Sequence, residues 1–314
     1  MIPKYILLKD KINEDIIKNI YPIGSNLPTE VELASMYDVS RSTVRQALSL
    51  LSDQGIISKR WGSGNTIINK PDNNKSKTVM VLLLNEKSTE EKNLLTDISS
   101  VLMKNGMTVE FHGTNNSFQT ERDYLNLLLN DIYGGLIINM ANSNLPSTNL
   151  DILQILLKRQ TPIVFINNAP SQLHNPTVIS LDYYNKGYLM ARHLINQGRR
   201  DLGGIFINND IASVKTFSGF VDAIRDADLK IHDDCMLWCN RHDTLVVNRF
   251  LKSTMDKVSD IYTDDNGINS NGSRPLITCH LSPSKSLGKE CGKAFLEIKK
   301  NGNCKSITIP FKHA

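Results

Sequence analysis

Two arginines, Arg41 and Arg45, stand four residues apart, with the hydroxyl side chains of Ser40, Ser42 and Thr43 beside them. On a helix this spacing places both guanidinium groups on one face. Each is a planar fork of donors that matches guanine O6 and N7 or a phosphate, and the amides of a helix N-terminus bind phosphate as well. The pattern indicates DNA contact. The plainer alternative is a pair of solvated arginines on an exposed helix face.

A second basic group, Lys59, Arg60 and Trp61, leads into Gly62 and Gly64. Glycines so close together provide the permissive backbone of a hairpin tip. At such a tip, the flat ring of Trp61 could lie against sugars or in a minor groove, beside Arg60. The alternative for Trp61 is ordinary packing.

Small amides and acids follow several apolar runs that are typical of strands. These residues are Asn85, Asn139, Asn167, Asn208 and Asp264. In open α/β sheets the ligand crevice lies at the carboxyl ends of the strands, so these groups would converge on one cleft. Amides and carboxylates suit a neutral, hydroxyl-rich ligand such as a sugar. The alternative is that Asn and Asp collect at strand ends because they favour turns and helix caps.

Four potential zinc ligands lie close together: His232, Cys235, Cys239 and His242. However, the residues between the cysteines are typical of a strand. At about 3.3 Å per residue, Cys235 and Cys239 would then stand about 13 Å apart, too far to share one ion. We therefore expect no metal site here.

Catalytic signatures are absent from the sequence. It has no Gly-x-Ser-x-Gly elbow, no phosphate-binding Gly-x-x-x-x-Gly-Lys and no His-Glu-x-x-His. Asp264 and Asp265 could be a general acid and base, but neighbouring residues of a strand point to opposite faces. We expect neither an enzyme nor a cofactor.

The first 69 residues predict three helices and a hairpin. Helical periodicity covers residues 4–19, a capping box at Thr29 and Glu32 starts a second helix that ends near Tyr37, and Ser40 caps a third that Gly55 closes. Strands follow at 56–61 and 65–69. This order defines a winged helix-turn-helix, whose third helix fits a major groove.

The polar stretch 70–77, punctuated by Pro71, predicts a linker between domain 1–69 and domain 78–314. In the rear domain, helical segments alternate with strands expected at 78–84, 107–111, 136–140, 163–167, 202–207 and 258–263, and Ser88 with Glu91 offers a capping box. Such alternation predicts parallel sheets covered on both faces.

The chain of 314 residues carries 36 Lys and Arg against 32 Asp and Glu, a net charge of +4. Within residues 1–77 the count is 11 against 8, so most of the excess, +3, is at the front. No apolar run approaches the roughly 20 residues that span a bilayer, and no signal peptide opens the sequence, so we expect a cytoplasmic protein. The five cysteines, an odd number, are expected to be reduced thiols.

Residues 4–68 resemble the DNA-binding domain of the gluconate-repressor (GntR) family. The motifs are Leu27-Pro28-Thr29-Glu30-x-Glu32-Leu33-Ala34, Val39-Ser40-Arg41-Ser42-Thr43-Val44-Arg45, Leu51-x-x-x-Gly55-Ile56-Ile57 and Gly62-x-Gly64. The resemblance implies recognition-helix contacts for Arg41, Ser42, Thr43 and Arg45, a helix-two contact for Glu30, and a wing at Gly62 and Gly64. Pro3-Lys4-Tyr5 resembles the arabinose repressors of that family, in which Lys4 would approach phosphates. Val31 and Asn65-Thr66 depart from the family pattern, so the resemblance does not fix the operator sequence.

Residues 78–314 resemble the effector domain of lactose- and galactose-type repressors. The matching segments include Pro162-Ile163-Val164-Phe165-Ile166-Asn167, Ser218-Gly219-Phe220 and Asp264-Asp265. The resemblance implies a two-lobed, periplasmic-binding-protein-like fold with Asn167 and Asp264 at effector positions. Thr216, with Lys215 beside it, stands where the family carries an arginine that grips the sugar. Between residues 244 and 264 there is room for a single helix and strand, one strand–helix unit fewer than the family carries, which predicts a trimmed second lobe.

Together these observations predict a homodimeric transcriptional repressor that binds a pseudo-palindromic operator and is released by a small sugar such as L-arabinose. One alternative is a constitutive DNA-binding regulator with an inert sensor. Another, from a different class, is a sugar-processing or carrier protein with an incidental basic front end.

Overall fold

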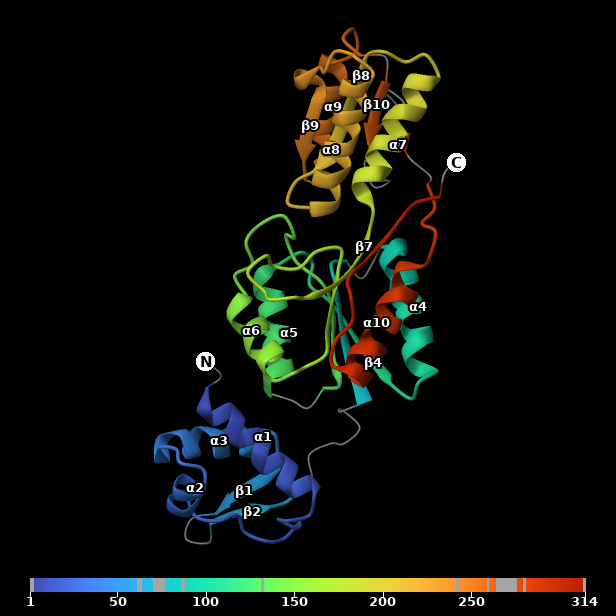
Figure 1. Ribbon diagram of the computed structural model, residues 1–314. Helices are drawn as coiled ribbons and strands as arrows, with labels where there is room; N and C mark the ends of the chain where they lie inside the picture. The colour runs from blue at the N-terminus through green and yellow to red at the C-terminus, as the bar shows by residue number, and fades with distance from the viewer. Residues whose placement is uncertain are drawn as a thin grey trace.

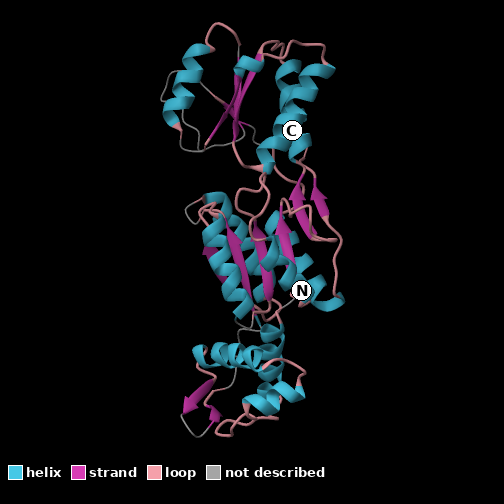
Figure 2. Cartoon of the chain, turned by 90° about the vertical axis from the view of Figure 1, so that its left-hand side faces the viewer, coloured by secondary structure: helices cyan, strands magenta, loops and turns pink. Residues whose placement is uncertain are grey.

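A computed structural model shows a front domain and two stacked lobes (Figures 1 and 2). It describes residues 3–60, 64–69, 77–85, 88–130, 133–240, 243–258, 260–263, 276–278 and 281–312. The front domain comprises α1 (Lys4–Ile17), α2 (Glu30–Met36), α3 (Arg41–Asp53), β1 (Ile57–Arg60) and β2 (Gly64–Ile67). β1 and β2 pair antiparallel, as a winged helix-turn-helix requires.

The front helices begin where the sequence predicts, although α1 ends at Ile17, before the predicted end at residue 19. Thr29 and Glu32 form the capping box of α2, and the hydrogen bonds from Thr29 hold the pKa of the Glu32 carboxyl below its ordinary value. Asp38, at φ 48°, makes the tight turn before α3. One apolar core joins the three helices to the wing, and its members include Leu8, Ile12, Ile16, Leu33, Val44, Leu48, Leu51 and Ile67.

The first lobe is a six-stranded sheet in the order β12-β7-β6-β5-β3-β4, parallel throughout. Its strands are β3 (Thr78–Leu83), β4 (Thr108–Gly113), β5 (Gly135–Asn139), β6 (Ile163–Ile166), β7 (Thr177–Leu181) and β12 (Ile307–Ile309). Helices α4 (Thr89–Met103) and α10 (Leu287–Asn301) cover one face, and α5 (Phe118–Asn130) and α6 (Leu150–Lys158) cover the other. Alternate residues of β3 enter the two cores, so the strand is buried on both faces.

The second lobe is a sheet whose described strands have the order β11-β10-β8-β9. They are β8 (Leu202–Ile207), β9 (Met236–Cys239), β10 (Asp260–Thr263) and β11 (Ile277–Thr278). Helices α7 (Tyr183–Asn196) and α8 (Ile211–Asp226) pack on one face, and α9 (Thr244–Ser253) packs on the other. A short 3-10 turn, Asp233–Cys235, precedes β9.

The carboxyl ends of the two sheets face each other. β7 runs directly into α7 at Asp182, which carries the chain from the first lobe into the second (Figure 1). The Ser143 hydroxyl, in the loop after β5, accepts a hydrogen bond of 3.2 Å from the amide of Ile211, just after β8. Among the described residues, no helix is long and apolar enough to cross a membrane.

Two expectations about local structure need correction. Ser88 does cap α4, but Glu91 completes no capping box, because its carboxylate accepts hydrogen bonds from the amides of Leu84 and Asn85 instead. Cys235 is not part of a strand, since it ends the 3-10 turn before β9. The proposed linker lies outside the described residues except for Lys77.

Candidate functional site

The N-terminus of α3 gathers three hydroxyl side chains. Ser40 caps the helix by accepting a hydrogen bond from the amide of Thr43 at 3.2 Å. Its hydroxyl also lies 2.8 Å from the hydroxyls of Ser42 and Thr43. These hydroxyls surround the positive end of the helix dipole, which is an arrangement that suits a phosphate oxygen.

Arg41 and Arg45 extend from the first two turns of α3 on the side opposite its buried stripe. Both side chains are more than half exposed, 59% and 64%. Glu30, at the start of α2, accepts a hydrogen bond from Nε of Arg45 at 2.8 Å, and its carboxylate lies 4.0 Å from Arg41. One carboxylate thus orients two arginine forks on an exposed face.

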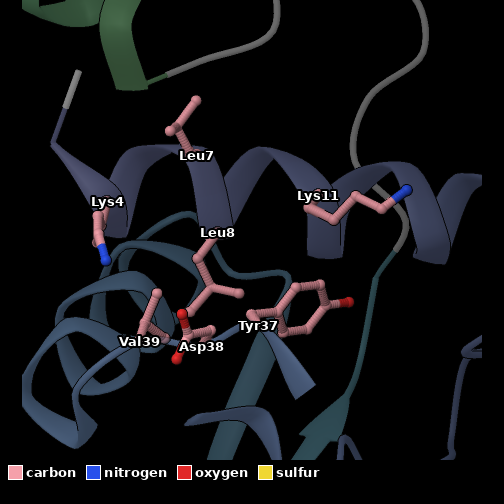
Figure 3. A pocket seen from close by; sticks show the side chains of 7 residues that line it. All are labelled: Lys4, Leu7, Leu8, Lys11, Tyr37, Asp38 and Val39. Carbon is pink, nitrogen blue, oxygen red and sulfur yellow. The ribbon is translucent and has the colours of Figure 1, made fainter. Parts of the chain in front are cut away.

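Lys4 and the wing are the other predicted DNA contacts of the front domain. Lys4 is exposed at the start of α1 and lies beside an open groove between α1 and the turn that precedes α3; in Figure 3 its side chain points toward Val39, whereas Lys11 points away. In the wing, Arg60 pairs in register with Gly64, whose φ of 84° requires a residue without a side chain. Trp61 and Gly62 lie outside the described residues.

The strand-end amides of the first lobe lie at one edge of its sheet. Asn85 follows β3, Asn139 ends β5 and Asn167 follows β6, and all three are half-buried. Asn167 has a left-handed backbone with φ 64°, and its backbone N–H donates a hydrogen bond to the carbonyl of Ile179 at 2.8 Å. Its side-chain oxygen is buried and finds no hydrogen-bond partner among the described residues. Such an acceptor is what a ligand hydroxyl would satisfy.

The loop between β5 and α6 approaches both lobes at this edge. The carbonyl of Ser143 accepts a hydrogen bond from the Asn168 side chain at 2.9 Å, while the Ser143 hydroxyl reaches the start of α8. Because Ile211 is the first residue of α8, the Ser143 hydroxyl satisfies one of the amides that a helix N-terminus leaves without an intrahelical partner.

Glu121 fixes that loop, and the sequence analysis missed it. Its carboxylate is fully buried and accepts hydrogen bonds from the amide of Ala141 at 2.7 Å and the side chain of Asn149 at 2.9 Å. Burial raises the pKa of the Glu121 carboxyl above its ordinary value, although both hydrogen bonds oppose the rise. A glutamate among the apolar positions of α5 is the signal that could have indicated it.

Lys215 and Thr216 occupy different surroundings on α8. Lys215 is partly exposed, whereas Thr216 is fully buried, and its hydroxyl has no hydrogen-bond partner among the described residues. A Cβ added to Gly187 of α7 would come within 1.9 Å of the Thr216 carbonyl oxygen. Thr216 therefore lies where α7 and α8 cross in close contact.

The remaining predicted residues divide between described and undescribed parts of the chain. Asp264 lies outside the described residues, so its place in the cleft stays a prediction. His242, one of the four potential zinc ligands, also lies outside the described residues. His232 lies 3.0 Å from the carboxylate of Asp201, and Cys235 and Cys239 are buried. In the described part, no three His, Cys, Asp or Glu side chains gather as metal ligands would.

Comparison with known proteins identifies the front domain. Residues 5–67 match the family of bacterial regulatory proteins called the gntR family. This range contains the capped α3, its two arginines, Glu30 and the wing. The front segment is therefore a DNA-binding domain of the gntR family.

Two curated relatives extend the likeness into the rear domain. The chain is 27% identical over 235 residues to the arabinose metabolism transcriptional repressor of Halalkalibacterium halodurans, covering 73% of this chain and 62% of that protein. It is 28% identical over 239 residues to the protein of the same name from Geobacillus stearothermophilus, covering 75% and 65%. The chain thus spans less than two thirds of either relative. Both relatives are named as transcriptional repressors.

Among solved structures, the rear domain is similar to the Cra transcriptional dual regulator from Pseudomonas putida, a complex with fructose 1-phosphate. The TM-score is 0.64 at 12% identity, covering 76% of this chain and 98% of that one. At this identity the likeness establishes the fold alone. The chain therefore joins a gntR-type winged helix-turn-helix to a two-lobed α/β domain that has the fold of this solved transcription regulator.

Proposed function

We propose that this protein is a sequence-specific, DNA-binding transcriptional repressor. The observation that supports it most is the exposed face of α3, where Arg41 and Arg45 are oriented by Glu30 beside a hydroxyl-lined helix N-terminus. Forked donors at the start of a recognition helix read guanine edges, and the helix N-terminus binds phosphate. The contact extends to the flanking DNA backbone and the minor groove through Lys4 of α1 and through the wing residues Arg60, Trp61, Gly62 and Gly64.

The rear domain serves, in this proposal, as a sensor for a small neutral sugar. The unpartnered oxygen of Asn167 lies at the carboxyl edge of the first sheet, where Asn85 and Asn139 also lie, and Asp264 and Lys215 would complete the site from the second lobe. The names of the two curated relatives favour arabinose. A homodimer would present two winged helices to a pseudo-palindromic operator, and sugar binding would shift it out of its DNA-binding geometry.

A second candidate is a constitutive DNA-binding regulator whose sensor is inert. Among the described residues between 244 and 263, only α9 and β10 are regular elements, and β10 pairs directly with β8. This supports a trimmed second lobe with one strand–helix unit fewer, and Thr216, buried against α7, offers no guanidinium for a sugar. A sugar-processing or carrier protein is the remaining alternative.

A gel-shift with the DNA upstream of the protein's own gene, with and without a panel of sugars, separates these candidates. Specific retardation that L-arabinose or a related sugar reverses supports the sensing repressor. Retardation that no sugar alters favours the constitutive regulator. No retardation by any upstream fragment contradicts DNA binding and leaves the carrier protein.

A further inference from the structure

Helix α1 is buried along two separate stripes. The stripe that enters the core of the front domain consists of Leu8, Ile12 and Ile16. A second stripe, displaced around the helix, consists of Ile6, Lys9 and Asn13, which are 3%, 0% and 2% exposed. Ile6 is the apolar member of this stripe and lies outside the apolar core of the front domain, so something other than that core covers it.

The cover is the end of the first lobe. The Lys9 ammonium donates hydrogen bonds to the carbonyl of Leu129 at 3.3 Å and to the carbonyl of Asn130 at 2.7 Å. These are the last two residues of α5, and the Gln54 side chain, just after α3, also donates to the carbonyl of Asn130. The front domain therefore contacts the C-terminal end of α5, which lies next to it in Figure 1.

An ion pair adds the end of α6 to this contact. Arg159, the C-cap of α6, donates to the carbonyl of Leu129 at 2.9 Å and pairs with the carboxylate of Asp10. Asp10 also lies 3.3 Å from the Lys9 ammonium. Arg159 is only 13% exposed, so both cations of the contact are shielded from water.

The charges of this contact suit the ends of helices. The last carbonyls of a helix have no intrahelical donors, and the helix dipole places partial negative charge there. A buried ammonium is tolerated only with partners of this kind, and Asp10 supplies the compensating carboxylate. The front domain thus contributes Lys9 and Asp10, and the lobe contributes carbonyls and Arg159.

One feature of the contact opposes permanent association. Neither the oxygen nor the nitrogen of the buried Asn13 amide has a hydrogen-bond partner among the described residues. Leaving such a group unsatisfied costs about 1–3 kcal/mol, which water would relieve if the two domains separated. The contact therefore combines favourable ionic hydrogen bonds with the free-energy cost of an unsatisfied buried amide, which favours reversible association. We call this contact between α1 and the C-terminal ends of α5 and α6 the joint.

At their other ends, helices α5 and α6 of this joint lie near the contact between the two lobes. At their N-terminal ends, Glu121 of α5 holds the loop that precedes α6, and Ser143 of that loop bonds to α8. Arg122 and Asp151 tie the two helices together there, at 2.8 Å. A helix of 13 residues spans about 20 Å, so α5 and α6 connect the interlobe contact to the joint.

We infer that Lys9 and Asp10 dock the front domain reversibly on the C-terminal ends of α5 and α6, and that this docking fixes the orientation of α3 for operator binding. The second half of this statement rests on the proposed function. Docking leaves Arg41 and Arg45 exposed, so the docked domain can still reach DNA. A fixed orientation favours two half-sites because their spacing is set by geometry.

Acetylation of the full-length protein, followed by mass spectrometry, tests the docking without DNA. Lys11 and Lys18 on the same helix are 49% and 60% exposed and serve as internal references. In the parent, Lys9 should react at least about tenfold more slowly than Lys11, since a buried ammonium is shielded. Asp10→Arg, which places a third cation between Lys9 and Arg159, should raise the Lys9 rate to that of Lys11.

Two variants complete this design. The charge exchange Asp10→Arg with Arg159→Asp should restore the protection of Lys9, whereas Glu14→Arg makes the same charge change at an exposed position of α1 and should leave Lys9 protected. Equal rates for Lys9 and Lys11 in the parent would overturn the docking. Protection that persists in Asp10→Arg would overturn it as well, because Lys9 would then be buried within the front domain itself.

The same proteins test the link to operator binding. Asp10→Arg should weaken binding of the upstream DNA at least about fivefold, the charge exchange should restore it, and Glu14→Arg should not weaken it. Added positive charge by itself strengthens DNA binding, so a loss can be attributed to orientation. Unchanged affinity in an undocked Asp10→Arg protein would overturn the role of the joint. A parent that binds no DNA would refute the proposed function while the acetylation result stands.

Discussion

Glu30 accepts a hydrogen bond from Nε of Arg45 at 2.8 Å and lies 4.0 Å from Arg41, so one carboxylate of α2 holds both arginines of α3. All three side chains are partly or largely exposed, and exposed ion pairs contribute about 0–1 kcal/mol to stability. The arrangement therefore affects what the arginines can bind far more than whether the domain folds.

Glu30→Gln should reduce discrimination between operator and unrelated DNA. Removing the carboxylate leaves two uncompensated cations, which strengthens sequence-independent attraction to phosphate, while the arginine forks lose their orientation. Anisotropy titrations with operator and a shuffled duplex measure the ratio of the two affinities. A ratio equal to that of the parent would show that Glu30 does not orient the arginines.

Arg45→Ala should weaken operator binding by about 1–3 kcal/mol, because it removes one forked donor. The melting temperature should stay near that of the parent, since the side chain is 64% exposed. Gln46→Ala, a neighbouring exposed position of α3, is the matched control for folding and helix content. Early melting, or operator binding as strong as that of the parent, would show that Arg45 is structural or merely solvated.

Glu121→Gln should flatten the dependence of stability on pH. The pKa of Glu121 is raised in the folded protein by burial, so the folded state holds a proton that the unfolded state releases first. The free energy of unfolding should therefore fall as pH rises from the ordinary pKa of a glutamate to the raised value. Urea unfolding across this range measures it. The same pH dependence in parent and variant would contradict the assignment.

Thr216→Arg should destabilise the second lobe instead of restoring a grip on a sugar. Thr216 is fully buried where α7 crosses α8, so a longer side chain would force the helices apart, and overpacking costs about 1–3 kcal/mol or more. Thermal melting and calorimetry with L-arabinose compare it with Ser218→Arg on the exposed face of α8. A stable variant that binds arabinose more tightly than the parent would contradict this placement.

Much of the front domain follows from local sequence. The starts of α2 and α3 are set by Thr29 and Ser40, whose caps are formed by groups within three residues. The same locality explains why the six rear strands were expected within about two residues of their bounds, since buried parallel strands are continuous apolar runs. Three other strands, β7, β11 and β12, were not expected. β11 and β12 have only two and three residues, and β12 pairs with β7, which lies far earlier in the chain.

The candidate sites were harder to predict where contacts are long-range. The role of Glu121 depends on Ala141 and Asn149, and the burial of Lys9 depends on carbonyls 120 residues away. Family position placed Thr216 in the sensor site, but the close crossing permitted by Gly187 buries it between two helices. Helical periodicity cannot reveal a second buried stripe when its central residue is a lysine.

The dependence of DNA binding on salt and sequence tests the central claim most directly. Titrations of the DNA upstream of the protein's own gene and of an unrelated duplex, repeated at several salt concentrations, measure both. The account predicts affinity that falls steeply with salt, and specific binding at least about a thousandfold tighter than binding to unrelated duplex. Equal affinity for the two duplexes, or no binding to either, would contradict a sequence-specific repressor.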